Sequence, residues 1–157
     1  MAKEQIGYNS PEGSVAPGLG REVIACGAAT TLVAADSHAL VLLDTAAGSI
    51  LTLPTPVAGM TFDIAVSVSV TSNSHVITTA ATATEFLAGG LQQMIDTTAV
   101  SEGQFLNGTS HVTLTHNGTT TGGLIGTYYT FTAVSATVWM VSGLNASSGT
   151  LATPATT

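Results

Sequence analysis

Positively charged side chains are scarce in this 157-residue chain, which has two Lys and Arg residues against nine Asp and Glu residues. Both cations, Lys3 and Arg21, lie near the start, so residues 22–157 carry none. Nucleic-acid binding, attachment to anionic membranes through a basic patch, and phosphate recognition all depend on Lys or Arg. We therefore expect no nucleic-acid partner, no membrane partner and no phosphate chemistry.

Long hydrophobic runs and paired cysteines are also missing. No apolar run approaches the roughly 18 residues that a membrane-spanning helix needs. Met1 to Gln5 are polar and lead into no hydrophobic segment, so we expect no secretory signal and synthesis in a cytoplasm. The single Cys26 has no partner for an intramolecular disulfide and is expected to pack as a small buried hydrophobe.

Motifs for catalysis or metal binding are equally scarce. The chain has neither a Gly-x-Ser-x-Gly nucleophile elbow nor an HExxH motif, and its acidic residues are scattered singly. His111 and His116 are five residues apart and would face opposite sides of a strand, whereas Asp36 and His38 would still need a third ligand. We expect no catalytic residue, no metal site and no cofactor.

Hydroxyl side chains take the place of charges, since the chain has 27 Thr and 14 Ser residues. Thr favours strands, and a hydroxyl hydrates an exposed strand face without charge. Residues 22–143 show short β-rich runs broken by turn residues, which predicts one β-sandwich domain. Residues 1–21 are rich in Gly and Pro and predict an extended arm, either a disordered terminus or a segment ordered on a partner. Residues 144–157 predict an extended or disordered tail.

Two regions give the clearest strand patterns. Between residues 62 and 70, apolar and polar or small residues alternate, which is typical of a strand with one face in a core. Residues 128–133 and 138–142 resemble a final antiparallel pair. On the first of these, Tyr129, Phe131 and Ala133 share one face and are expected in the core, and Trp139 is expected to anchor the core or an oligomer interface.

Turn residues between the runs suggest hairpins. We expect residues 71–74 to join the strand before them to residues 75–79, and Asn117-Gly118 to form a two-residue hairpin turn rather than part of a phosphate cradle. Residues 80–90 suggest a short helical turn, and residues 91–96 and 99–105 are weaker strands. These patterns predict an all-β fold: a single antiparallel β-sandwich, jelly-roll-like, with an extended N-terminal arm, a flexible C-terminal tail and no long helix.

Several segments between residues 40 and 143 resemble small capsid decoration, or cement, proteins of tailed bacteriophages. The resemblance is carried by Leu43–Ser49 before a strand ending in Leu53-Pro54, by residues 70–77, by the Asn-Gly-Thr segments at 107–109 and 117–126, and by Val138-Trp139. It implies a virion component made in the host bacterial cytoplasm. On the capsid surface it would bind the major capsid protein and itself, as a homotrimer.

The predicted arm and the predicted trimer each suggest candidate binding residues. In the arm, we expect Ile6, Tyr8, Val15 and Arg21 to contact the capsid, while Tyr129 and Trp139 are oligomer or core anchors. The alternative function is a head-fibre or tail module that binds a receptor or carbohydrate, for which Tyr128, Tyr129 and Trp139 form the one dense aromatic cluster. A small hydrolase, with carboxylates that converge only in the fold, is a third hypothesis.

Overall fold

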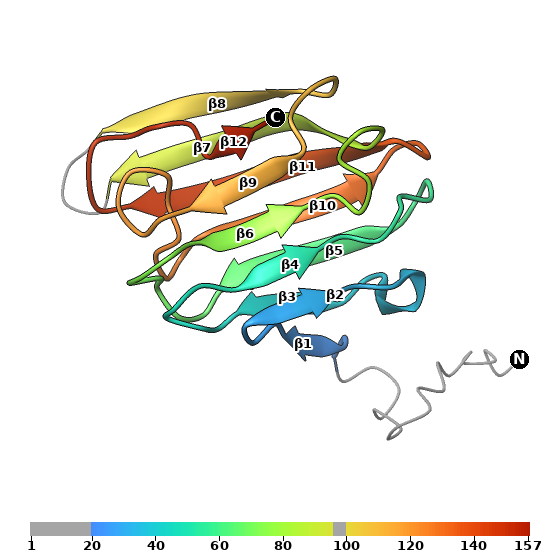
Figure 1. Ribbon diagram of the computed structural model, residues 1–157, viewed down its shortest axis with the longest axis horizontal. Coiled ribbons are helices and arrows are strands. Elements are labelled where there is room, and N and C mark those ends of the chain that lie inside the picture. The colour runs from blue at the N-terminus through green and yellow to red at the C-terminus, as the bar shows by residue number, and fades with distance from the viewer. Residues whose placement is uncertain (1–19, 96–99) are drawn as a thin grey trace, which may run out of the picture.

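The computed structural model describes residues 20–95 and 100–157, which are almost entirely β-structure (Figure 1). The strands are β1 Val23–Ala25, β2 Ala29–Thr31, β3 Leu40–Leu43, β4 Ile50–Thr52, β5 Thr61–Val66, β6 His75–Thr78, β7 Phe86–Ile95, β8 Ser101–Asn107, β9 Thr113–His116, β10 Tyr128–Ala133, β11 Val138–Ser147 and β12 Ala155–Thr156. The one helical element among these residues is a 3-10 turn, Ala34–Asp36. The predicted all-β class is confirmed.

The strands form two sheets that pack face to face. One has seven strands in the order β1-β3-β5-β10-β11-β7-β8, and the other has five in the order β12-β9-β6-β4-β2. In Figure 1 the five-stranded sheet lies in front of the seven-stranded one. Residues on facing sides of the two sheets fill the space between them, as expected for a sandwich-like arrangement.

Both sheets are mixed, which corrects the predicted antiparallel, jelly-roll-like sandwich. Five neighbouring strand pairs run parallel and five antiparallel. From β1 to β6 the chain changes sheet after every strand, so β1, β3 and β5 lie parallel in one sheet and β2, β4 and β6 in the other. A jelly roll consists of antiparallel strands. This part of the chain is instead a winding of three turns (Figure 1).

The two predicted hairpins are wrong for the same reason. Residues 71–74 join β5 to β6, which belong to different sheets, and residues 117–127 join β9 to β10, which do so as well. Gly118 has the positive φ, 79°, that favoured the Asn-Gly turn. The chain therefore bends at the expected place, but Asn117 does not share the positive φ of a two-residue hairpin turn, and the chain continues toward the opposite sheet.

The middle of the chain forms the longest strands. The weak strands expected at residues 91–96 and 99–105 are confirmed as parts of β7 and β8, which pair antiparallel. A short turn does form within residues 80–90, where the Glu85 amide donates to the Ala81 carbonyl, but it lies before the expected position at 85–87. β7 already begins at Phe86 and runs parallel to β11 through Ile95. Ten successive cross-strand pairs with β11 outweigh the helical tendency of one short Ala-rich stretch.

The two termini differ from expectation in different ways. Residues 1–19 of the predicted arm, which include Ile6, Tyr8 and Val15, lie outside the described residues. At the other end, the boundary at residue 143 falls inside β11, which continues to Ser147. β12 then pairs with β9, and Ala155 is buried against the core. The predicted flexible tail is therefore largely part of the sandwich.

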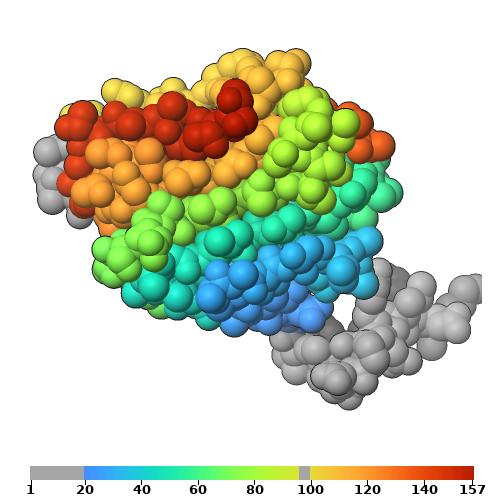
Figure 2. Space-filling model, in the orientation of Figure 1, coloured from blue at the N-terminus to red at the C-terminus, as the bar shows by residue number. Residues whose placement is uncertain are grey.

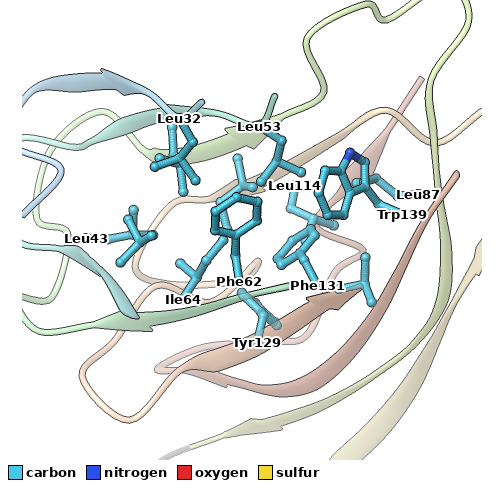
Figure 3. Close-up of a cluster of buried hydrophobic side chains, with 14 of the residues drawn as sticks. Leu32, Leu43, Leu53, Phe62, Ile64, Leu87, Leu114, Tyr129, Phe131 and Trp139 are labelled. Carbon is cyan, nitrogen blue, oxygen red and sulfur yellow. The ribbon is translucent and has the colours of Figure 1, made fainter. Parts of the chain in front are cut away.

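The core lies between the sheets and is built from alternate residues of the strands (Figure 3). In β5, the predicted alternation holds: Phe62, Ile64 and Val66 are buried and the residues between them are not. Tyr129, Phe131 and Ala133 of β10 are buried on one face, as predicted. The predicted final pair, β10 and β11, is antiparallel.

Candidate functional site

The outer face of the five-stranded sheet carries a row of threonines that crosses every strand of that sheet. The row consists of Thr31, Thr52, Thr78, Thr113 and Thr156, which are neighbours in the cross-strand register. The hydroxyl oxygens of Thr78 and Thr113 lie 3.0 Å apart. Figure 2 views this face, on which successive strands appear as bands. Hydroxyl and methyl groups give it hydration without charge.

The outer face of the seven-stranded sheet is more apolar. It bears five exposed large hydrophobic side chains: Val23, Met94, Phe105, Tyr128 and Met140. On the outer face of the five-stranded sheet, Ile50 is the one exposed large hydrophobic side chain among the described residues. Exposed apolar side chains that gather on one face of a sheet are typical of surfaces that bind another protein.

One cross-strand row on this face runs from edge to edge of the seven-stranded sheet. Its members, in order, are Val23, Leu40, Asp63, Thr130, Ser142, Gly90 and Phe105. Asp63 is the one carboxylate in the row. We call the outward face of β5, β10, β11, β7 and β8 in this sheet the apolar face.

The charge of Asp63 is matched locally. Arg21 forms an ion pair with the Asp63 carboxylate, and the Thr130 hydroxyl donates a hydrogen bond to it. The hydrogen bond from Thr130 and then the Arg21 guanidinium hold the pKa of Asp63 below its usual value. The side chains of this pair are 44% and 36% exposed, so the pair adds little to stability. Arg21, predicted to contact a capsid, thus fixes the start of the body to the seven-stranded sheet.

A groove of about 470 Å³ lies on the apolar face, lined by Gly90, Leu91, Gln92, Gly103, Gln104, Phe105 and Gly143. Glycines occupy outward positions of β7 and β8 here, so bare backbone forms the floor of the groove. The Phe105 side chain stands beside it and is 76% exposed, more than any other large hydrophobic of the described residues. The surface therefore has a projecting aromatic ring and a depression next to each other.

The predicted aromatic anchors lie inside the sandwich. Trp139 and Tyr129 are 0% and 1% exposed, so their side chains contact this chain's own core. The Trp139 and Phe62 rings pack with centroids 5.8 Å apart. Tyr128 points to the opposite side of the sheet and is 55% exposed. The three aromatics of the carbohydrate-binding alternative therefore do not share a surface, and that alternative gains no support from the structure.

Two buried histidines form a network that the sequence did not suggest. His75 and His116 are neighbours in the register of β6 and β9, and both are fully buried. The His75 Nδ1 atom accepts from the Ser49 amide, and its Nε2 lies 3.0 Å from the Val68 carbonyl. His116 Nε2 is 2.7 Å from the Tyr129 hydroxyl, and its Nδ1 faces the His75 carbonyl. Each ring thus has one nitrogen that donates a hydrogen bond and one that accepts, as in a neutral imidazole.

Burial governs how these groups titrate. Desolvation lowers the pKa of His116 to about 4 and also lowers the pKa of His75. It raises the pKa of the Tyr129 phenol well above its ordinary value, which keeps the phenol a donor to His116. The network is thus a neutral, structural connection between the two sheets.

We expect acid to destabilise the protein through His116. The unfolded chain binds a proton at His116 near pH 6.5 and the folded chain only near pH 4. The contribution of His116 to the free energy of unfolding should therefore be constant above pH 6.5 and fall by about 3 kcal/mol between pH 6.5 and 4. Urea unfolding at a series of pH values measures this loss. His116→Gln should abolish most of it, whereas the control His111→Gln should retain it. An unchanged loss in His116→Gln would contradict the assignment.

The remaining candidate residues from the sequence do not come together in one site among the described residues. Cys26 is buried, and burial raises the pKa of its thiol. Among residues 20–95 and 100–157, no group of three or more His, Cys, Asp and Glu side chains is arranged to hold a metal ion. No helix in these ranges has the length and apolar character to cross a membrane. The glycines at 118, 122 and 123 are themselves buried and pack against Val70, Asn145 and His116.

Comparison of the chain with protein-family models, curated proteins and solved structures gives no match. Any functional conclusion therefore comes from the surfaces of this chain and from its sequence. The apolar face is the feature that the sequence analysis missed. The alternation within β10 and β8 identifies Tyr128 and Phe105 as outward residues, but only the register places them on one continuous surface.

Proposed function

We propose that this chain is a bacteriophage capsid decoration protein, which binds the outer surface of the major capsid protein shell as a homotrimer and stabilises the head. The observation that carries the proposal is the apolar face: a broad sheet surface with exposed Phe105, Tyr128 and Met140 and a locally neutralised carboxylate. Such a surface suits burial in a permanent assembly. The sequence resemblance over residues 40–143 supports the same function.

The two outer faces suit different surroundings. The apolar face is suited to contact with protein, and the threonine row on the opposite sheet is suited to water. A particle-bound protein present in many copies needs both surfaces on a rigid support. The paired strands and closely packed core of this sandwich provide that support, because close packing resists deformation under many repeated contacts.

The arm has a defined point of departure in this proposal. Arg21 is held to Asp63 on the outer side of the seven-stranded sheet, next to β1. The segment that precedes it includes Ile6, Tyr8 and Val15, the apolar residues that we propose bind a neighbouring capsid subunit. Because residues 22–157 contain no Lys or Arg, the body offers the shell no cation, and contacts of its apolar face would be apolar or hydrogen-bonded.

We expect deletion of residues 2–20 to abolish binding to shells while the body stays folded. The deletion keeps Arg21 and therefore the ion pair with Asp63. The measurement is co-sedimentation of the purified protein with shells from which the native protein has been removed, quantified by mass spectrometry. A control protein carries residues 2–20 in scrambled order, which preserves length and composition. Full binding of the deleted protein would refute the role of the arm.

The number and distribution of copies on purified virions test the function as a whole. A decoration protein should be present in hundreds of copies spread over the head, as seen with an antibody against this chain. A few copies at one vertex would indicate a fibre or tail component instead. Virions that contain no copies would refute the proposed function.

A further inference from the structure

We propose that the β7–β8 end of the apolar face binds a second copy of this chain, with Phe105 of one copy seated in the groove beside Gly90 and Gly103 of the other. This inference deepens the proposed function and rests on its homotrimer, since it names the surface through which the copies meet. It follows from the shape, polarity and charge of one surface.

The shape argument concerns Phe105 and the groove. The ring is 76% exposed, so the fold of a single copy makes little use of its apolar surface. The groove beside it has a floor of bare backbone, because Gly90 and Gly103 carry no side chains there. A projection and a depression on one face can engage their counterparts on neighbouring copies. Around a three-fold axis the ring of each copy would enter the groove of the next, which closes the trimer.

The side chains around the groove have the polarity of an interface core. Met94 and Met140 lie on the same side of the sheet as Phe105 and are 42% and 43% exposed. Their flexible thioether chains can adjust to a second surface. Ser142 and Gly90, which lie between the two methionines in the strand register, are small and let two sheet faces approach closely. Aromatic residues and methionine are enriched in the centres of protein interfaces.

Charge identifies the occupant as a copy of the same chain. Two molecules of net charge −7 repel each other, so their contact must lie where the charge is compensated. On the apolar face the Asp63 carboxylate is paired with Arg21. Glu102 of β8 lies opposite Gln93, an inward position, and so faces away from the groove side of that strand. A strongly charged partner would find no unpaired opposite charge here among the described residues, whereas a second neutral face fits.

The edge of the sheet adds a further contact. β8 is the last strand of the seven-stranded sheet, and Phe105 sits near the middle of its seven residues. An edge strand leaves one row of backbone amides and carbonyls unpaired within its sheet. A second copy that covers the groove would also lie along this edge, in reach of those groups.

The test measures the mass of the full-length protein in solution by sedimentation and light scattering, without any shell. The wild type should have three times the 15.7 kDa mass of one chain. Phe105→Lys should weaken self-association by about 30-fold or more. Gly90→Leu, which fills the groove without adding charge, should do so as well. Its β-carbon would meet only the Gln104 carbonyl, at 3.7 Å, so the variant should fold.

The matched control is Ile50→Lys, which adds the same charge at an exposed apolar residue of the opposite sheet and should leave the mass unchanged. Circular dichroism verifies that each variant is folded. A wild type that remains at 15.7 kDa at every concentration, or folded Phe105→Lys and Gly90→Leu variants of wild-type mass, would overturn the inference. Self-association without shell binding would refute the proposed function alone. Shell binding by a trimeric wild type whose folded Phe105→Lys and Gly90→Leu variants keep the same mass would refute this inference alone.

Discussion

Replacing Trp139 by Ala should remove about 3–5 kcal/mol from the free energy of unfolding, as truncation of large buried aromatics does. Trp139 is fully buried on β11 and packs against Phe62 in the centre of the core. The lost ring leaves a cavity between two sheets whose backbones are fixed by hydrogen bonds, so the core cannot fully close around it. Since small domains are stable by about 5–15 kcal/mol in total, a large part of the stability would be lost. Urea unfolding followed by circular dichroism measures it.

Two further variants make the Trp139 result specific. Trp139→Phe keeps an aromatic ring and should cost less than the alanine variant. It also removes the indole Nε1 of Trp139, which is buried and has no hydrogen-bond partner among the described residues. Ile50→Ala truncates an exposed side chain of the other sheet and should cost less than about 1 kcal/mol. A Trp139→Ala variant as stable as Ile50→Ala would show that the two sheets do not pack through this ring.

Replacing Gly122 by Ala should cost roughly 2–5 kcal/mol, because both the backbone and the space oppose a side chain there. Gly122 has φ +88°, and a β-carbon would lie 1.6 Å from the Asn145 Oδ1 atom. Asn145 has little freedom to move, since it is buried on β11 and donates a hydrogen bond to the Thr121 carbonyl. The substitution therefore separates the loop from β11. Thermal unfolding compared with the wild type measures the loss.

Gly126→Ala is the matched control for Gly122→Ala. Gly126 lies four residues later with a similar φ of +102°, but no atom lies within 4 Å of the position that a β-carbon would take. It should cost only about 1 kcal/mol, from the backbone conformation. Equal losses in the two variants would mean that contact with Asn145 does not matter. A further variant, Asn145→Ala combined with Gly122→Ala, should recover part of the difference, since it removes the atoms that the new methyl group meets.

The sequence was sufficient to predict the strands that have one face in the core and the other on the outer surface. In β5 and β10, a core on one side and an outer face on the other require the period of two seen at Phe62 and Ile64 and again at Tyr129 and Phe131. Local alternation is a property of each strand by itself. It therefore needs no knowledge of which strand lies alongside.

The sheet to which each strand belongs could not be predicted in this way. The turn at residues 71–74 has the same composition whether the chain returns in the same sheet or crosses to the other. The direction in which the chain leaves the turn depends on backbone conformations such as the positive φ of Asn73, 55°, which the composition of the turn does not specify. The apolar face depends on this choice, because Phe105, Ser142 and Thr130 become neighbours only through long-range pairing.

The buried histidines show a different limit of sequence reasoning. His116 follows Val112 and Leu114 on the inward face of an alternating strand, and Tyr129 has the pattern of a core aromatic, but neither strand identifies the partner of the other. Their hydrogen bond joins β9 of one sheet to β10 of the other. A polar side chain is stable in a core only with its partner in place, and the partner here is 13 residues away and in the opposite sheet.

The winding from β1 to β6 gives this protein a simple way to change in size. Each turn of the winding, such as β3 with β4, adds one strand to both sheets and leaves the order of the remaining strands unchanged. Gain or loss of one turn would widen or narrow the molecule by about 4.8 Å, the spacing between neighbouring strands. The edge with β7 and β8 would be untouched. Descendants of one gene could thereby match surfaces of different spacing while they retain the same means of contact.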